Sequence, residues 1–499
     1  MNEMRLKPTL IAGAMFLALA ATAHAQGTDL LRDATQKAVS SNPDVTARYN
    51  ALRAAGDAID AARGAWLPRV DLQAGVGRVD DRITTRTPAS DGMTHNGVAL
   101  QVVQTLWDGL ATRNDVDRLA HERLARWFEF VEASEQAALE AARAYYDVLR
   151  YRRLVTLAED NYVQHKYAFT QIQSRVRAGV GRGVDLEQSG ARVALAESNL
   201  TTEIANLHDV VARYQRIVGE APPASMPLPA AMRGGVPATA SEVVAAATVR
   251  SAAVSASIEN LRAARSAATL RESAFQPRIE ARARTGAGRN FDTLADQRRE
   301  TSADLTLSWN LFNGGADRAR VRQAANLLNQ AADLRDKTCR DVRQTALIAY
   351  NDTRKLTDQL ALLDRNVIAI EKARDAYSQQ FEINQRSLLD LLNAENELYT
   401  ARRALANAEY DQGVAHLRTQ AALQQLTVQL GLRRIDADRP VVDTSTWGAE
   451  GDAPARCPAG AVDFPTTDRS ELDARAQRMA TSAPAPAAPA SAPATAPRR

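Results

Sequence analysis

The sequence is poor in aromatic residues and carries little net charge. Aromatic residues make up 5% of the 499 residues, whereas hydrophobic residues reach 45% because alanine is abundant. Length alone suggests about three domains, but a chain dominated by Ala, Leu, Arg and Glu is typical of long helices and coiled coils. The formal net charge of +3 gives no reason to expect a nucleic-acid partner. The composition therefore favours an elongated helical protein.

Long hydrophobic runs are also missing. After the first residues, no stretch reaches the roughly 18 uninterrupted apolar residues of a spanning helix, so a membrane role has to come from β-strands. Residues 1–25 have the pattern of a secretory signal peptide, with a positive start, a short apolar run over 9–20 and a small-x-small cleavage site at 23–25. The mature chain is expected to begin at Gln26. Because no cysteine follows the cleavage site, we expect no lipid anchor.

Cysteine is almost absent. Cys339 lies in a helical pattern and Cys457 in a Pro-rich tail. The two could form a disulfide in an oxidising compartment. We favour the alternative that Cys339 is a small buried apolar residue, and the pairing stays open.

The sequence has no catalytic constellation. It lacks a phosphate-binding P-loop, a GxSxG elbow and a clustered acid–base set. The histidines that follow the cleavage site are too widely spaced to predict a metal pair: His95, His121, His165, His208 and His416. We therefore expect no enzyme, no metal site and no cofactor.

The main feature of the sequence is a duplication. The first copy covers residues 26–219 and the second covers 241–431. Each copy opens with an Ala-rich helical segment that ends in an aromatic residue and a proline, continues with alternating segments and closes with long helical patterns. One common offset relates Leu106-Trp107-Asp108-Gly109 to Leu311-Phe312-Asn313-Gly314 and Asp185 to Asp390. The last helix of the second copy is longer by one heptad, which keeps the same helix face inward.

Two further segments lie outside the copies. Residues 220–240 are rich in proline and form a linker. Residues 432–499 form a C-terminal extension that we expect to be largely disordered, because its end, 482–499, is rich in Ala and Pro.

Each copy contains two long helices, predicted over about 110–178 and 184–218 in the first and about 316–385 and 388–430 in the second. The stretch 110–178 contains no proline or glycine and would measure about 100 Å as a helix. Apolar residues, many of them alanine, recur every three or four positions and predict closely packed helices. An ordinary fibrous coiled coil would show the same pattern.

The strand patterns argue for a membrane protein instead. Strands are predicted over about 68–80, 96–106, 277–289 and 301–312, where apolar and polar residues alternate. About ten residues suffice for a tilted strand to cross a bilayer. Aromatic residues near the strand ends would form an interface girdle. They are Trp107, Trp309 and Phe312.

Four strands cannot close a barrel around a channel. Three chains would give a 12-stranded closed sheet without exposed edges. The polar segments 80–96 and 288–300 would join the strands as loops facing outside the cell. A soluble hairpin with one buried face is the alternative, because signals of this length are individually weak.

These features together resemble the TolC family of outer-membrane factors over roughly Asp29–Gly431. The marks are Asn42-Pro43, the helix-to-proline junctions at Pro68 and Pro277, the Trp-Asp-Gly and Phe-Asn-Gly strand exits, and the helix starts at 184–187 and 389–394. The resemblance implies a mainly α fold with a membrane β-barrel. Three chains would form a 12-stranded barrel and an α-helical tunnel, located in the outer membrane and extending into the periplasm.

The family fold implies a tip where each helical hairpin turns. The first turn would use Gly179, Gly181 and Gly183, because glycine supplies the backbone freedom of a tight turn. The run follows a helix rather than a strand, which argues against a phosphate loop. The second turn is predicted over 384–387 and ends at Ser387. These turns are the candidate surface for docking a periplasmic adaptor.

The resemblance also implies a periplasmic gate. Arg386 matches the family's linking arginine, Asp185 its acidic partner, and Asp390 one position of an acidic ring. Phe381 replaces a tyrosine and Asn393 replaces a second aspartate, which implies a looser and less acidic gate. Alternatively, Asp185 and Asp390 only stabilise the N-termini of their helices.

The implied partners are two further copies of the chain, outer-membrane lipid, a periplasmic adaptor and an inner-membrane ABC transporter or other pump. The cargo could be a whole protein, such as a repeat-in-toxin haemolysin or adenylate-cyclase toxin exported by type I secretion, which the missing lipid anchor favours. It could also be drugs expelled by a multidrug pump. A periplasmic coiled-coil scaffold or adaptor without a barrel is the alternative from another class.

Overall fold

The computed structural model describes residues 29–82, 84–85, 87, 90–383, 385–438, 442, 447, 457 and 467–482. The predicted signal peptide lies outside these residues. The chain forms two units, Met1–Ala459 and Gly460–Arg499. Among the described residues, no helix combines the length and the apolar character that a membrane crossing requires.

The second unit contains one described helix, α10 (Arg469–Ser482). The C-terminal extension, expected to be largely disordered, therefore includes a regular element. Its sequence contains neither proline nor glycine and is rich in good helix formers. The Ala/Pro-rich end, 483–499, lies outside the described residues.

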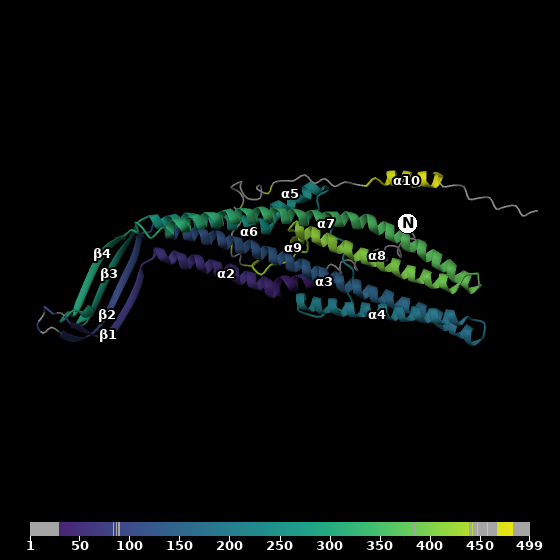
Figure 1. Cartoon of the computed structure of the whole chain (residues 1–499), viewed down its shortest axis with the longest axis horizontal. Helices are drawn as coiled ribbons and strands as arrows, with labels where there is room; N and C mark the ends of the chain where they lie inside the picture. Colours follow the sequence, from purple (N-terminus) through teal and green to yellow (C-terminus); the bar gives the residue numbers. More distant parts are fainter. Residues whose placement is uncertain are drawn as a thin grey trace, which may run out of the picture. The chain divides into compact units, whose positions relative to one another are not determined.

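The first unit contains one antiparallel sheet at one end of its long helices (Figure 1). The strand order is β1-β2-β3-β4. The strands are β1 (Arg69–Arg82), β2 (Ser90–Trp107), β3 (Arg278–Arg289) and β4 (Arg299–Ser308). β2 begins earlier than predicted, because backbone pairing runs up to Arg82 opposite Ser90 without needing apolar side chains. β4 ends at Ser308, before the predicted end at 312.

The two faces of the sheet differ in chemistry. Leu72 lies opposite Leu100, and Ile279 lies opposite Leu307. Large apolar side chains on this face are exposed, including those of Leu72, Leu100, Leu305 and Leu307. The neighbouring positions, such as Asp71 opposite Gln101, put polar groups on the other face. An exposed apolar face of this extent is the surface that a membrane strand presents to lipid.

Four long helices form two hairpins that extend away from the sheet (Figure 1). They are α3 (Ala111–Arg177), α4 (Gly183–Val218), α7 (Ala316–Glu382) and α8 (Leu388–Ala422). A helix over 29–41, α2 (Pro43–Arg63), α5 (Ala240–Arg250) and α6 (Ala252–Glu272) pack along them. α2 and α6 occupy equivalent places in the two repeats, each leading into a strand.

The helix predicted over 388–430 is interrupted. α8 ends at Ala422, and the short helix α9 (Leu426–Gln429) follows. Gln424 has a φ of 54°, which breaks the helix. The buried carboxylate of Glu135 on α3 accepts hydrogen bonds from the backbone N–H groups of Leu426 at 2.6 Å and Thr427 at 3.2 Å. This cap comes from the other repeat, so local sequence does not reveal it.

The linker between the repeats is tied to both hairpins. The Tyr145 hydroxyl donates to the carbonyl of Pro227 at 2.9 Å. Tyr350, the equivalent position in the second copy, donates to the carbonyl of Ala238. The main hydrophobic core surrounds Tyr145 and includes Tyr214 and Leu417.

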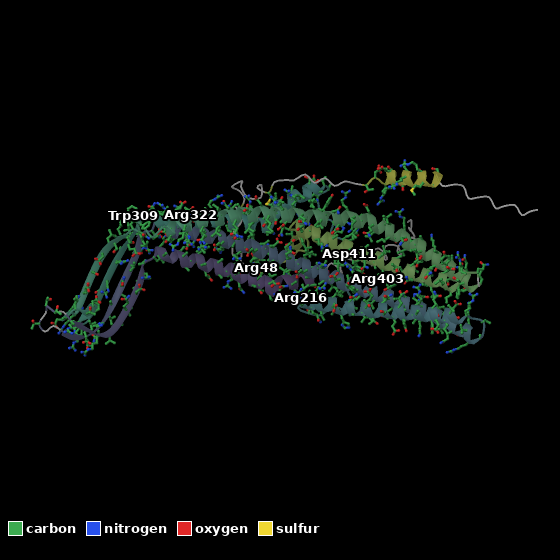
Figure 2. All side chains as sticks on the ribbon, in the orientation of Figure 1. Arg48, Arg216, Trp309, Arg322, Arg403 and Asp411 are labelled. Carbon is green, nitrogen blue, oxygen red and sulfur yellow. A yellow bond between two sulfur atoms is a disulfide. The ribbon has the colours of Figure 1, made fainter. Side chains whose placement is uncertain are left out.

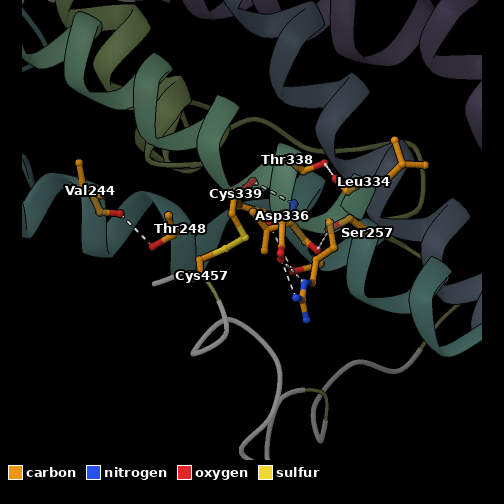
Figure 3. Close-up of a disulfide and its surroundings, with 12 residues drawn as sticks. Val244, Thr248, Ser257, Leu334, Asp336, Thr338, Cys339 and Cys457 are labelled. Carbon is orange, nitrogen blue, oxygen red and sulfur yellow. Dashed lines mark hydrogen bonds and ion pairs between the residues drawn. A yellow bond between two sulfur atoms is a disulfide. The ribbon is translucent and has the colours of Figure 1, made fainter. Parts of the chain in front are cut away.

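Cys339 and Cys457 form a disulfide, with Cα atoms 5.5 Å apart (Figure 3). The preference for an unpaired Cys339 was therefore wrong, although the residue is buried. Trp447 explains the pairing, because its indole packs on Phe128 with ring centroids 4.6 Å apart and donates to Glu259 at 2.8 Å. These contacts hold the C-terminal segment against the helices next to Cys339.

Candidate functional site

The first tip turn joins α3 to α4 and is a Schellman motif. The N–H of Val180 donates to the carbonyl of Arg175, and that of Gly179 donates to the carbonyl of Val176, both at 3.0 Å. Gly179 has a φ of 75°, a conformation that glycine adopts without steric cost.

The other two glycines of this turn differ in their requirements. A Cβ atom on Gly181 would lie 2.8 Å from both the backbone nitrogen and the Cγ2 atom of Val176, so a side chain does not fit there. A Cβ on Gly183 would meet nothing within 4 Å. Two of the three predicted glycines are therefore required by the geometry of the turn.

The second tip turn joins α7 to α8. Asn384 lies outside the described residues, but the N–H of Gln385 donates to the carbonyl of Gln380 at 2.8 Å. Ser387 caps α8: its hydroxyl accepts from the N–H of Asp390 at 3.2 Å and donates to the Asp390 carboxylate at 2.9 Å. The carboxylate of Asp390 is therefore held in place by the cap.

The predicted gate arginine has three partners on its own hairpin. The Arg386 Nε donates to the side-chain oxygen of Gln380 at 3.1 Å. The Nη1 atom of Arg386 lies 3.6 Å from Oδ2 of Asp390. Its guanidinium lies 4.8 Å from the ring centroid of Tyr377. Within one chain Arg386 does not contact Asp185, whose carboxylate has no partner among the described residues. Asp185 lies in the first turn of α4.

Phe381 and Asn393, where the sequence departs from the family pattern, join the two hairpins. The Arg175 guanidinium of α3 lies 4.9 Å from the ring centroid of Phe381 on α7. The Arg192 guanidinium of α4 donates to the Asn393 amide oxygen on α8 at 2.8 Å. Phe381 also packs against a small core formed by Ile172, Leu388 and Leu392.

Sequence reasoning missed the partners of these residues. Arg175, Arg192, Tyr377 and Gln380 stand on helix surfaces, where their residue types are common and no motif marks them. The contacts of Arg175 and Arg192 depend on the packing of one hairpin on the other, whereas those of Tyr377 and Gln380 depend on the turn between α7 and α8.

Ion pairs also connect the hairpins farther from the tip, and two of their residues, Arg403 and Asp411, are labelled in Figure 2. Arg403 of α8 lies 2.5 Å from the carboxylate of Glu203 on α4, which is only 2% exposed. Arg150 of α3 donates to Asp411 of α8 at 2.5 Å. Because both pairs connect different repeats, they hold the two hairpins of a chain together.

One histidine near the tip is buried without a full set of partners. His165 on α3 is 3% exposed, and its Nδ1 atom has no hydrogen-bond partner. Burial, and secondarily the positive charge of Arg192, lower the pKa of His165 below its ordinary value. Protonation of His165 is therefore less favourable in the folded chain than for an exposed histidine.

The predicted interface aromatics lie where the sheet meets the helices. Trp107, Trp309 and Phe312 are all exposed, Phe312 to 84%. The Trp309 indole donates to the carbonyl of Phe275 at 3.1 Å, which holds the end of β4 to the start of β3 (Figure 2). Trp66 and Phe275 are also exposed where the sheet meets the helices, so they add to the predicted interface aromatic residues.

Within the described ranges, no group of three His, Cys, Asp or Glu side chains is placed to hold a metal ion.

Sequence comparison matches the chain to one family model in two segments. The family described as "Outer membrane efflux protein" matches residues 34–220 and 243–427, one segment in each repeat. The chain is 27% identical over 430 residues to the outer membrane efflux protein BepC of Brucella suis, covering 85% of this chain and 92% of that protein. It is 27% identical over 428 residues to the alkaline protease secretion protein AprF of Pseudomonas aeruginosa, covering 82% of this chain and 86% of that protein.

Structural comparison shows the fold. The CmeC outer membrane channel of Campylobacter jejuni superposes with a TM-score of 0.72 at 14% identity, covering 86% of this chain and 89% of that chain. The duplicated fold predicted from the sequence, with four strands and long helices per chain, is confirmed.

The buried histidine makes the tip sensitive to acid. The pKa of His165 is lowered in the folded chain. A form in which the α3–α4 hairpin opens and exposes His165 therefore binds more protons than the folded form below about pH 6.5. The folded hairpin loses stability as the pH falls. We expect hydrogen exchange at residues 160–195 to accelerate between about pH 7.5 and pH 5 after correction for intrinsic rates, and His165→Gln to reduce this acceleration. The exposed His208 on α4 offers the control, since His208→Gln should leave it intact. The same acceleration in all three proteins would contradict this role of His165.

Proposed function

The chain belongs to the outer membrane efflux protein family, and on this premise we propose that it is the outer-membrane duct of a type I secretion system that exports a whole protein. Proteins of this family are channels of the outer membrane that continue into the periplasm. They are not enzymes, so the energy for transport comes from a partner.

The sheet supports a trimeric duct. β1 and β4 are its outer strands, and each leaves one edge unpaired within the described part of the chain. In a bilayer, unpaired backbone groups cost several kcal/mol each, so the edges have to pair with other copies. Three chains give a 12-stranded barrel, with the apolar face towards lipid and the polar face lining the pore.

The helical hairpins then form the tunnel, and their tips meet the partners. An inner-membrane ABC transporter or other pump supplies the energy, and a periplasmic adaptor connects it to the tips. The tip turns carry exposed apolar residues, Val180, Val184 and Ile383, beside the polar groups of the gate. Such a mixed surface suits contact with another helical protein.

The type I assignment rests on one observation, the similarity over most of both chains to AprF, which is an alkaline protease secretion protein. Protein toxins, such as repeat-in-toxin haemolysins or adenylate-cyclase toxins, are the cargo class we propose. The similarity to BepC, an efflux protein that the chain matches over 85% of its own length, supports the second candidate, the outer-membrane factor of a multidrug pump.

The tip supports a gate made of two kinds of contact. Arg386 binds Asp390, Gln380 and Tyr377 within its own hairpin, so it shapes the second turn. The Arg175–Phe381 and Arg192–Asn393 contacts hold the two hairpins together. In a trimer, the carboxylate of Asp185 is available to a neighbouring chain, and three copies of Asp390 would form a ring that favours cations.

Loss of the gene separates the two cargo classes. In a deletion strain, we expect the secreted protein of the neighbouring export genes to remain inside the cell, as measured by immunoblotting of cells and medium. Expression of the chain from a plasmid should restore secretion. Normal secretion combined with hypersensitivity to drugs would instead assign the chain to a multidrug pump.

The gate is tested by removing its arginine. Arg386→Ala deletes an ion pair and a cation–π contact in each chain, each worth about 0.5–1 kcal/mol at an exposed site. We expect the single-channel conductance of purified trimers in planar bilayers to rise. Arg182→Ala removes the same charge from the first turn, where the arginine side chain has no partner among the described residues, and should leave conductance near the wild-type value. Equal conductance of all three proteins would exclude the gate role of Arg386.

A further inference from the structure

The connection between β3 and β4 folds back onto the sheet. It contains the short 3-10 helix η3 (Phe291–Thr293), and the Phe291 side chain is only 4% exposed. A Cβ atom on Gly286 would lie 2.1 Å from the Cζ atom of this ring, and a Cβ on Gly97 would lie 2.4 Å from its Cδ2 atom. The phenyl ring therefore rests directly on two strand glycines.

The ring lies on the polar face of the sheet. Gly286 pairs with Ala99, and Arg284 pairs with Gln101, so these four residues share one face with Gly97. Leu100, between Ala99 and Gln101, points to the opposite, apolar face. Ala99 is only 3% exposed, whereas most of this small sheet is open to solvent. In a closed barrel, Phe291 and its loop lie inside the pore.

Several polar contacts hold the loop in this position. Both Nη atoms of Arg284 bind the Asp292 carboxylate, Nη2 to Oδ1 at 3.0 Å, and the guanidinium lies 5.3 Å from the Phe291 ring centroid. The side-chain amide of Asn290 donates to the carbonyl of Thr94 at 2.9 Å, and Asn96 accepts from the N–H of Arg289 at 2.9 Å. The loop is thus bound to both β2 and β3.

The loop backbone is also strained. Of the six non-glycine residues with positive φ in the described part of the chain, four lie here: Asn290, Asp292, Thr293 and Asp296. Such conformations persist where surrounding contacts enforce them, and they concentrate at functional sites. An open space of about 600 Å³ adjoins Phe291 and Asp292 on the polar face, which gives the loop room to shift.

We propose that residues 290–298 form a plug that narrows the outer end of the pore, with one plug from each chain. The inference rests on the proposed function, because it requires the sheet to close into a barrel. The contacts described above hold the plug to β2 and β3 of its own chain, and none of their residues belongs to the tip turns. Passage of cargo moves Phe291 away from the two strand glycines and breaks the Arg284–Asp292 pair.

The plug is tested by access to a reporter below it. Val103 lies on the same face of β2 as Gln101 and closer to the helices, so Val103→Cys places a thiol deeper in the pore. Both native cysteines are joined in a disulfide, so only the new thiol reacts. The measurement is the rate at which a polymer-linked, membrane-impermeant maleimide labels intact cells.

Two substitutions open the plug in different ways. Gly286→Ala adds a methyl group on β3 that displaces the Phe291 ring. Phe291→Ala removes the ring and leaves the strand unchanged. Gly75→Ala is the matched control, because Gly75 lies opposite Gly97 on the same face and its Cβ would meet nothing within 4 Å. We expect labelling to accelerate about tenfold in the first two, the factor that corresponds to a loss of about 1.4 kcal/mol from the closed state, and to stay unchanged in the control.

The outcomes separate the plug from the duct. Equal labelling rates in all variants, with heat-stable trimers that conduct ions, would overturn the plug and leave the duct intact. If Gly286→Ala prevents trimer formation, Phe291→Ala decides the question alone. A reporter that is never labelled, together with an absence of conductance, would overturn both proposals.

Discussion

The unpaired edges of the four-stranded sheet are the constraint on which the rest of the structure depends. The sheet has an apolar face suited to lipid, and its strands β1 and β4 each leave one edge without a partner within the described chain. Water cannot satisfy these backbone groups inside a bilayer, so copies of the chain have to pair edge to edge until the sheet closes. Closure of the barrel arranges the helical hairpins around the same axis. The tunnel is therefore a consequence of how the strands are completed.

The two hairpins of one chain are held together by shared apolar cores and by polar contacts. Near the middle of the shaft, the buried Glu203 carboxylate meets Arg403, whereas at the tip the contacts are Arg175 with Phe381 and Arg192 with Asn393. Exposed contacts of these kinds contribute little free energy each, and the apolar core at the tip is smaller than the main core, which supports the proposal that the tip is the part that opens. The loop between β3 and β4 is likewise held by a small set of contacts, which include the Phe291 ring, the Arg284–Asp292 pair and the hydrogen bond from Asn290 to Thr94.

Features with a regular period could be predicted from the sequence, and features that depend on tertiary packing could not. The duplication, the strands and the long helices follow from spacing, and the family resemblance and the outer-membrane location are confirmed. The break at Gln424 depends on Glu135 from the other repeat, and the disulfide depends on the docking of Trp447. The loop between β3 and β4 was expected to be a polar segment facing outside the cell, and its contacts with the sheet were not predicted. Its position depends on two glycines that leave room for the phenyl ring and that the pairing of β2 with β3 places on one face. The spacing of residues along the chain does not reveal this arrangement.

The central claim is that the chain encloses a pore only as a closed assembly of three copies. It is tested most directly by native mass spectrometry of the mature protein released from lipid nanodiscs, with conductance measured on the same preparation. The account predicts a mass of three chains together with a conducting channel. A helical monomer that remains in solution and never inserts into lipid would contradict it.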